Sequence, residues 1–172
     1  MNIHPIVVHF PIALLIVYSM IEIISYISPT WSAKLYTTKT ICLWIGALGT
    51  IAAMSSGDTA KHLIWLRFPL VKTHETWASA TQITYMVIAI YYVIKTIITD
   101  NLWGKYWSKY TQQYSSQITM FLSSRWTALV IMIASVVWIG LLTIVGALGG
   151  AIVRGTGTGD PVTDWVVTIF VK

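Results

Sequence analysis

Charged residues are scarce in this chain. Asp, Glu, Lys and Arg together make up 10% of the 172 residues, whereas they form about a quarter of an average soluble domain. The mean hydropathy of +0.70 agrees with this shortage. The composition excludes an ordinary soluble domain and indicates a protein of the lipid bilayer. The basic residues are scattered along the sequence, so we expect no nucleic-acid partner.

Cysteine is almost absent as well. Cys42 is the one cysteine of the chain, which excludes a disulfide framework and a CxxCH motif for covalent haem attachment. The first apolar run lacks a basic segment before it and a small-residue cleavage site, so we expect it to stay in the protein as a helix. No combination of nucleophile, base and acid indicates independent catalysis.

Long apolar runs take the place of charge. Each has roughly the twenty residues needed to cross a hydrocarbon core. The runs lie at about 6–27, 39–56, 77–99 and 126–153. We therefore predict an all-α polytopic membrane protein, a four-transmembrane-helix bundle that forms a single membrane domain over the whole chain.

The few charges within these runs are Glu22, Lys39 and Lys95. Each lies near one end of its run, where it can snorkel or where the carboxylate can pair with a nearby lysine. Four crossings would place both termini and the 57–76 loop on one face of the membrane. Lys and Arg are divided almost evenly between the two faces, with a small excess on the other one. The positive-inside rule then favours both termini outside.

Aromatic residues recur at steps of three and four in residues 101–124, between the third and fourth runs. This spacing puts them on one face of a helix. They are Trp103, Tyr106, Trp107, Tyr110 and Tyr114. Because Trp and Tyr favour the headgroup region, we predict an interfacial amphipathic helix here. A helix that docks on a partner is the alternative.

The tail, residues 154–172, begins with a glycine-rich loop. Asp160 and Pro161 are typical of an N-cap and a first helical residue. The following stretch is too short to span a bilayer, and its pattern leaves helix and strand both open. We expect it to lie at the interface or to dock on a neighbour.

Small residues recur at helical spacing in two of the runs. They are Gly46, Gly49 and Ala53 in the second, and Gly146 and Gly150 in the fourth. Residues this small allow helices to approach closely in lipid. They can also clear a flat slot for a planar cofactor, and both interpretations can hold together.

All four histidines fall on one face of the predicted bundle. They are His4, His9, His62 and His74. Neutral imidazole is the commonest metal ligand and a usual axial ligand of haem iron. Ionisable groups near the hydrocarbon are costly and tend to mark sites. This clustering therefore predicts a cofactor site on the terminal face.

Haem b is the first hypothesis for that site. His9 and His74 would hold the iron from opposite sides, while His4 and His62 would hold a second haem or contact a propionate. Arg67 and Lys72, in or beside the loop that precedes the third run, would pair with propionates.

Three other hypotheses remain open. The first is a copper or zinc site built from three or four of the imidazoles, with Asp58 and Glu75 as hydrogen-bond acceptors behind them. His4 and His9 lie about 140° apart on an ideal helix and would converge only if Pro5 keeps His4 outside it. The second is a quinone pocket that uses one histidine and a carboxylate. The third is a structural or assembly subunit.

The stretch HPIVVHFPIALL, residues 4–15, resembles the start of a family of small bacterial and archaeal membrane proteins with an HPxxVHFPIAL signature and four predicted helices. SSGD at 55–58, His74 and GGAIVRGTGTG at 149–159 are similar to later parts of that family. Members resemble, or are joined to, Rieske and cytochrome modules. The resemblance implies a multi-pass subunit of a redox complex in a prokaryotic cytoplasmic membrane. Its partners would be other membrane subunits and an outer-face cytochrome or iron-sulfur protein. The segment 101–124 and the tail after Asp160 look like additions to the family pattern.

Overall fold

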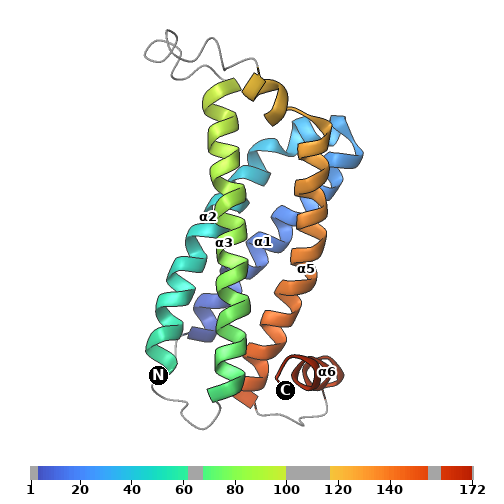
Figure 1. Ribbon diagram of the computed structural model, residues 1–172. Coiled ribbons are helices and arrows are strands. Elements are labelled where there is room, and N and C mark those ends of the chain that lie inside the picture. Colours follow the sequence, from blue (N-terminus) through green and yellow to red (C-terminus); the bar gives the residue numbers. More distant parts are fainter. Residues whose placement is uncertain (1–3, 62–67, 100–116, 155–159, 172) are drawn as a thin grey trace.

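The architecture is a bundle of long helices, seen in a computed structural model that describes residues 4–61, 68–99, 117–154 and 160–171. The helices are α1 (His4–Ile27), α2 (Pro29–Lys61), α3 (Phe68–Thr99), α5 (Arg125–Arg154) and α6 (Pro161–Phe170). The described residues form helices and no strand, which confirms the all-α prediction. Both ends of the described chain lie at one end of the bundle (Figure 1).

Four helices are long and apolar enough to cross a membrane, as predicted. These spans are Ile6–Ile27, Pro29–Ala60, Pro69–Ile97 and Arg125–Arg154. Apolar side chains such as Ile45, Ile90 and Val137 are about half exposed on the outside of the bundle. A surface of this kind suits contact with lipid rather than water.

The second and third helices extend beyond the apolar runs from which they were predicted. Polar residues there turn their hydroxyls to carbonyls of the preceding turn, which satisfies them without breaking the helix. In α3, Thr73 donates to the Pro69 carbonyl and Thr76 donates to the Lys72 carbonyl, each at 3.0 Å. One residue, Ser28, separates α1 from α2, because a residue before proline avoids the helical region and Pro29 suits a first turn.

Tight contact between α1 and α2 depends on small residues. A Cβ on Gly46 would lie 2.8 Å from Leu15 Cδ2, and one on Gly49 would lie 3.0 Å from Pro11 Cβ. The close approach predicted for these two glycines is therefore confirmed. Among the described residues no such approach occurs at Gly146 and Gly150, where a Cβ would meet nothing within 4 Å. The inward face of α5 is formed by other residues, such as Leu142, Val145 and Leu148.

The tail forms the helix α6, which lies across the end of the bundle (Figure 1). Asp160 is its N-cap and accepts a hydrogen bond from the Val162 N–H at 3.3 Å, as predicted. One face packs on α3 and α5, with the rings of Trp77 and Phe170 5.6 Å apart. Residues 117–122 are also helical, but most of the predicted interfacial helix at 101–124 lies outside the described residues.

Candidate functional site

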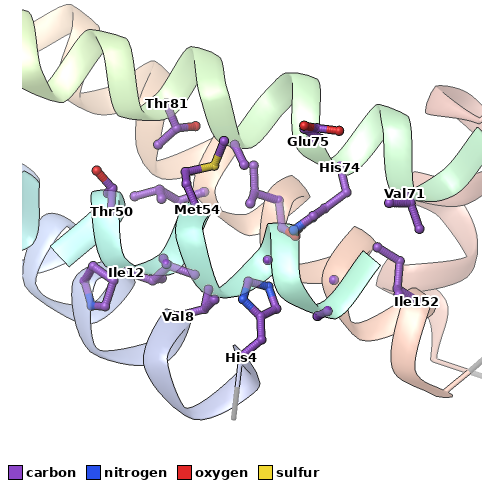
Figure 2. Close-up of a pocket in the computed structure, with 18 of the residues that line it drawn as sticks. His4, Val8, Ile12, Thr50, Met54, Val71, His74, Glu75, Thr81 and Ile152 are labelled. Atoms are coloured by element: carbon purple, nitrogen blue, oxygen red, sulfur yellow. Dashed lines mark hydrogen bonds between the residues drawn. The ribbon is translucent and has the colours of Figure 1, made fainter. Parts of the chain in front are cut away.

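An apolar cavity of about 130 Å³ lies between α1, α2, α3 and α5 at the terminal end of the bundle. Its walls include Val8, Ile12, Met54, Val71 and Ile152, together with Gly57, Gly149 and Thr81. Figure 2 shows His4 entering this space from α1 and His74 entering it from α3. The cavity therefore joins two of the predicted histidines.

His4 is held by the end of α2. Its Nδ1 lies 2.8 Å from the Ser56 hydroxyl oxygen, and that hydroxyl gives its one proton to the Ala53 carbonyl. Ser56 must then accept, so the Nδ1–H of His4 is the donor. The ring rests on Gly57, where a Cβ would lie 3.1 Å from Cε1. A larger residue at 57 would displace the imidazole.

His74 is held in the same way by α5. Its Nδ1 lies 3.1 Å from the Val145 carbonyl oxygen, which can only accept, so Nδ1–H is again the donor. The ring rests on Gly149, where a Cβ would lie 3.3 Å from Cε1. Each imidazole is therefore seated on a glycine of a neighbouring helix.

These contacts fix the same tautomer in both rings. With the proton on Nδ1, the lone pair is on Nε2 in each case. A histidine that binds a metal typically donates its other ring N–H to a fixed acceptor, which orients the ring and sets its tautomer. Both imidazoles are thus arranged as ligands or as hydrogen-bond acceptors.

The ionisation of His4 favours the same role. Burial lowers the pKa of His4 below 6.5, while the nearby Ala53 carbonyl has a smaller effect in the opposite direction. The net shift keeps the ring neutral near pH 7. Neutral imidazole is the form that binds metal ions.

The structure places His4, and not His9, on the cavity with His74. His9 is exposed and is not part of the cavity wall. A shared site for His4 and His9 required Pro5 to keep His4 outside the helix, but α1 begins at His4, because proline is tolerated within the first turn of a helix. The two histidines of α1 therefore point in different directions, as their spacing requires.

The remaining predicted residues lie in three settings. Asp58 and Glu75 are on the cavity wall. Lys72 is exposed on α3, outside that wall. His62 and Arg67 lie outside the described residues.

Within the described part of the chain, no group of three or more His, Cys, Asp or Glu side chains is placed to hold a metal ion. The two imidazoles are the nitrogen donors that the described part of the chain brings to the cavity, with Asp58 and Glu75 on the same wall. Such a pair suits a group that brings its other ligands with it.

Sequence reasoning missed the supports of the two imidazoles. Nothing in the sequence marks Gly57, Gly149 or Ser56 as a support of an imidazole, although all three lie in the family-like stretches at 55–58 and 149–159. These supports can be recognised only once it is known that α1 packs against α2 and that α3 packs against α5.

Four apolar helices around a histidine-lined cavity define a polytopic membrane protein with a candidate cofactor site. The chain belongs to the family described as "Predicted membrane protein (DUF2231)", whose model matches residues 1–160. The match ends where we expected an added tail. No curated protein and no solved structure matches the chain.

Proposed function

We propose that this protein is a membrane subunit of an electron-transfer complex and that it binds haem b between His4 and His74. The observation that supports this most directly is the pair of imidazoles on one cavity, each with Nδ1–H tethered and Nε2 as the lone-pair nitrogen. A haem supplies four nitrogens to its iron and so needs only two protein ligands. A protein-held zinc ion needs three or four.

The donor set fits haem, and the cavity volume does not. A cavity of about 150 Å³ holds one benzene ring, and this one measures about 130 Å³. A porphyrin, with four pyrrole rings, requires the helices to separate at the terminal end.

The volume favours a second candidate, the ring of a membrane quinone. One six-membered ring is the right size for the cavity, and its walls are mainly apolar. The two hydroxyls of a quinol can donate to the Nε2 atoms of His4 and His74. Glu75, on the same wall, supplies the carboxylate that we expected for a quinone pocket.

The proposal includes a location. With both termini outside, in the cytoplasmic membrane of a prokaryote, the cavity lies on the outer face. Its electron partner would then be an outer-face cytochrome or iron-sulfur protein, alongside other membrane subunits. A second haem on His62 remains a prediction, because that residue is outside the described part of the chain.

Optical spectroscopy tests the proposal directly. Protein purified in mild detergent from haem-replete cells should give a reduced-minus-oxidised spectrum with a b-type α band. His74→Ala should abolish the band because it removes one ligand. His9→Ala is the matched control, since it changes an exposed histidine of α1, and should keep the band.

A colourless preparation would contradict the haem proposal. Organic extraction of the same sample would then decide the second candidate, because stoichiometric quinone in the wild type and its loss in His74→Ala supports a quinone site. A sample with neither group and without copper or zinc would point to a structural subunit.

A further inference from the structure

A charged pair is buried inside the membrane-spanning part of the bundle, away from the cavity. Glu22 and Lys39 are 5% and 4% exposed, and Lys39 Nζ lies 3.0 Å from Glu22 Oε2. The Tyr92 hydroxyl donates to the same oxygen at 2.7 Å. The predicted pairing of Glu22 is confirmed, but the two side chains are enclosed rather than snorkelling. Ionisable groups at such positions often mark proton relays.

Further hydroxyl groups continue from this pair toward the cavity. The ring of Tyr18 packs edge-on against the rings of Tyr92 and Tyr85, with ring centres 6.3 Å and 6.0 Å apart. The hydroxyls of Tyr85 and Ser19 are hydrogen-bonded at 2.8 Å. We call the set the polar column; it consists of Ser25, Glu22, Lys39, Tyr92, Tyr18, Ser19 and Tyr85.

Two buried hydroxyls of the column, those of Tyr18 and Ser25, make no hydrogen bond of standard geometry within the described protein, although the Tyr18 hydroxyl lies beside Glu22 and Tyr92. They lie on α1 about one turn to either side of Glu22. Buried hydroxyls normally have a partner, and ordered water supplies it where the protein does not. These positions therefore indicate internal water on both sides of the carboxylate.

The cavity reaches the end of the column that lies nearest the chain termini. Leu15 and Thr81 line it, and each lies four residues, about one helical turn, before Ser19 or Tyr85 on the same helix. The polar groups thus extend from the end of α1 to within one turn of a space that opens at the other end of the bundle.

We propose that the polar column conducts protons between the α1–α2 connection and the cavity. In each transfer an O–H bond of a water, hydroxyl or carboxyl group breaks and one forms on the next oxygen, so one proton moves and nothing is oxidised or reduced. The path gives a redox group in the cavity access to protons from the opposite face. The inference goes beyond the proposed function and does not depend on which cofactor is bound.

Proton flux in vesicles tests the column without any cofactor. The full-length protein is reconstituted into liposomes that contain a pH-sensitive dye, and a potassium gradient with valinomycin drives protons inward. We expect flux above that of protein-free liposomes. Tyr18→Phe should lose this protein-dependent flux, because it removes one hydroxyl and keeps the ring contacts.

Tyr91→Phe is the matched control. The Tyr91 hydroxyl donates to the Leu122 carbonyl at 2.8 Å and is not part of the column. This variant should conduct like the wild type. Glu22→Gln gives a second test at the centre of the column and should also lose the flux. Wild-type flux equal to that of empty liposomes, or full flux in Tyr18→Phe, would overturn the proposal.

Discussion

Removing one partner of the Glu22–Lys39 pair should destabilise the bundle strongly. Lys39→Met leaves a carboxylate that is 5% exposed and has lost its cation, while the Tyr92 hydroxyl still donates to its Oε2 atom. Breaking a buried pair in this way costs about 3–5 kcal/mol. We therefore expect a loss in that range in the free energy of unfolding.

Glu22→Gln should cost less than Lys39→Met. The Lys39 ammonium lies 4.9 Å from the centre of the Tyr92 ring and 5.9 Å from that of Tyr36. Desolvated contacts of this kind contribute about 2 kcal/mol. The double variant leaves no buried charge and should be close to the wild type, because apolar replacement of a buried pair is often neutral or stabilising.

The wild type, the two single variants and the double variant form a double-mutant cycle. Their free energies of unfolding can be measured by reversible unfolding in mixed micelles, with dodecyl sulfate as the denaturant and circular dichroism as the signal. The coupling between the two positions should be large and favourable. A loss below about 1 kcal/mol in Lys39→Met, the range of solvent-exposed pairs, would refute the burial on which this reasoning depends.

Two further predictions concern the ionisation of His4 and the membrane topology. The pKa of His4 is below 6.5 in the folded protein, so the unfolded chain binds the proton first as pH falls. The contribution of His4 to thermal stability should therefore be constant above about pH 6.5 and should fall below it. His4→Ala should remove this part of the pH dependence. Cysteines introduced at Thr158 and Ser108 should react with an impermeant thiol reagent from opposite sides of the membrane, Thr158 from outside. Labelling of both from one side would contradict four spans, and reversed sides would contradict only the orientation.

The fold was largely predictable because lipid imposes a simple rule. Backbone groups in the hydrocarbon must be hydrogen-bonded within the segment, so an apolar run of sufficient length is a helix. The ends were less predictable. In the part of α3 that precedes the apolar run, the hydroxyls of Thr73 and Thr76 bond to the helix's own backbone, and hydropathy does not register such bonds. The close approach expected at Gly146 and Gly150 does not occur within the described bundle. The reason is that spacing alone does not say which side of a helix faces its neighbours.

The candidate site was predictable only as a set of residue types on one face. Sequence reasoning placed His74 at the start of the third helix, and the structure puts its ring on the cavity. It favoured His9 as the opposing ligand, whereas the structure brings in His4. That choice depends on the rotation of α1 about its axis. The contacts of Gly46 with Leu15 and of Gly49 with Pro11 help to fix this rotation, and they arise between helices rather than within either one.

The polar column is difficult to explain as a device for stability. A dry hydroxyl without a partner costs about 1–3 kcal/mol in a protein interior, and within the described column the hydroxyls of Tyr18 and Ser25 make no hydrogen bond of standard geometry. Phenylalanine or alanine would fill the same positions without that cost. An apolar pair in place of Glu22 and Lys39 would likewise avoid the cost of burying two charges. The cost is removed if water occupies the column, because each orphaned hydroxyl then has a partner. A hydrated row of hydroxyls around a buried carboxylate is, however, also what a proton needs to move through a membrane. The features that would weaken a dry bundle therefore support conduction in a hydrated one.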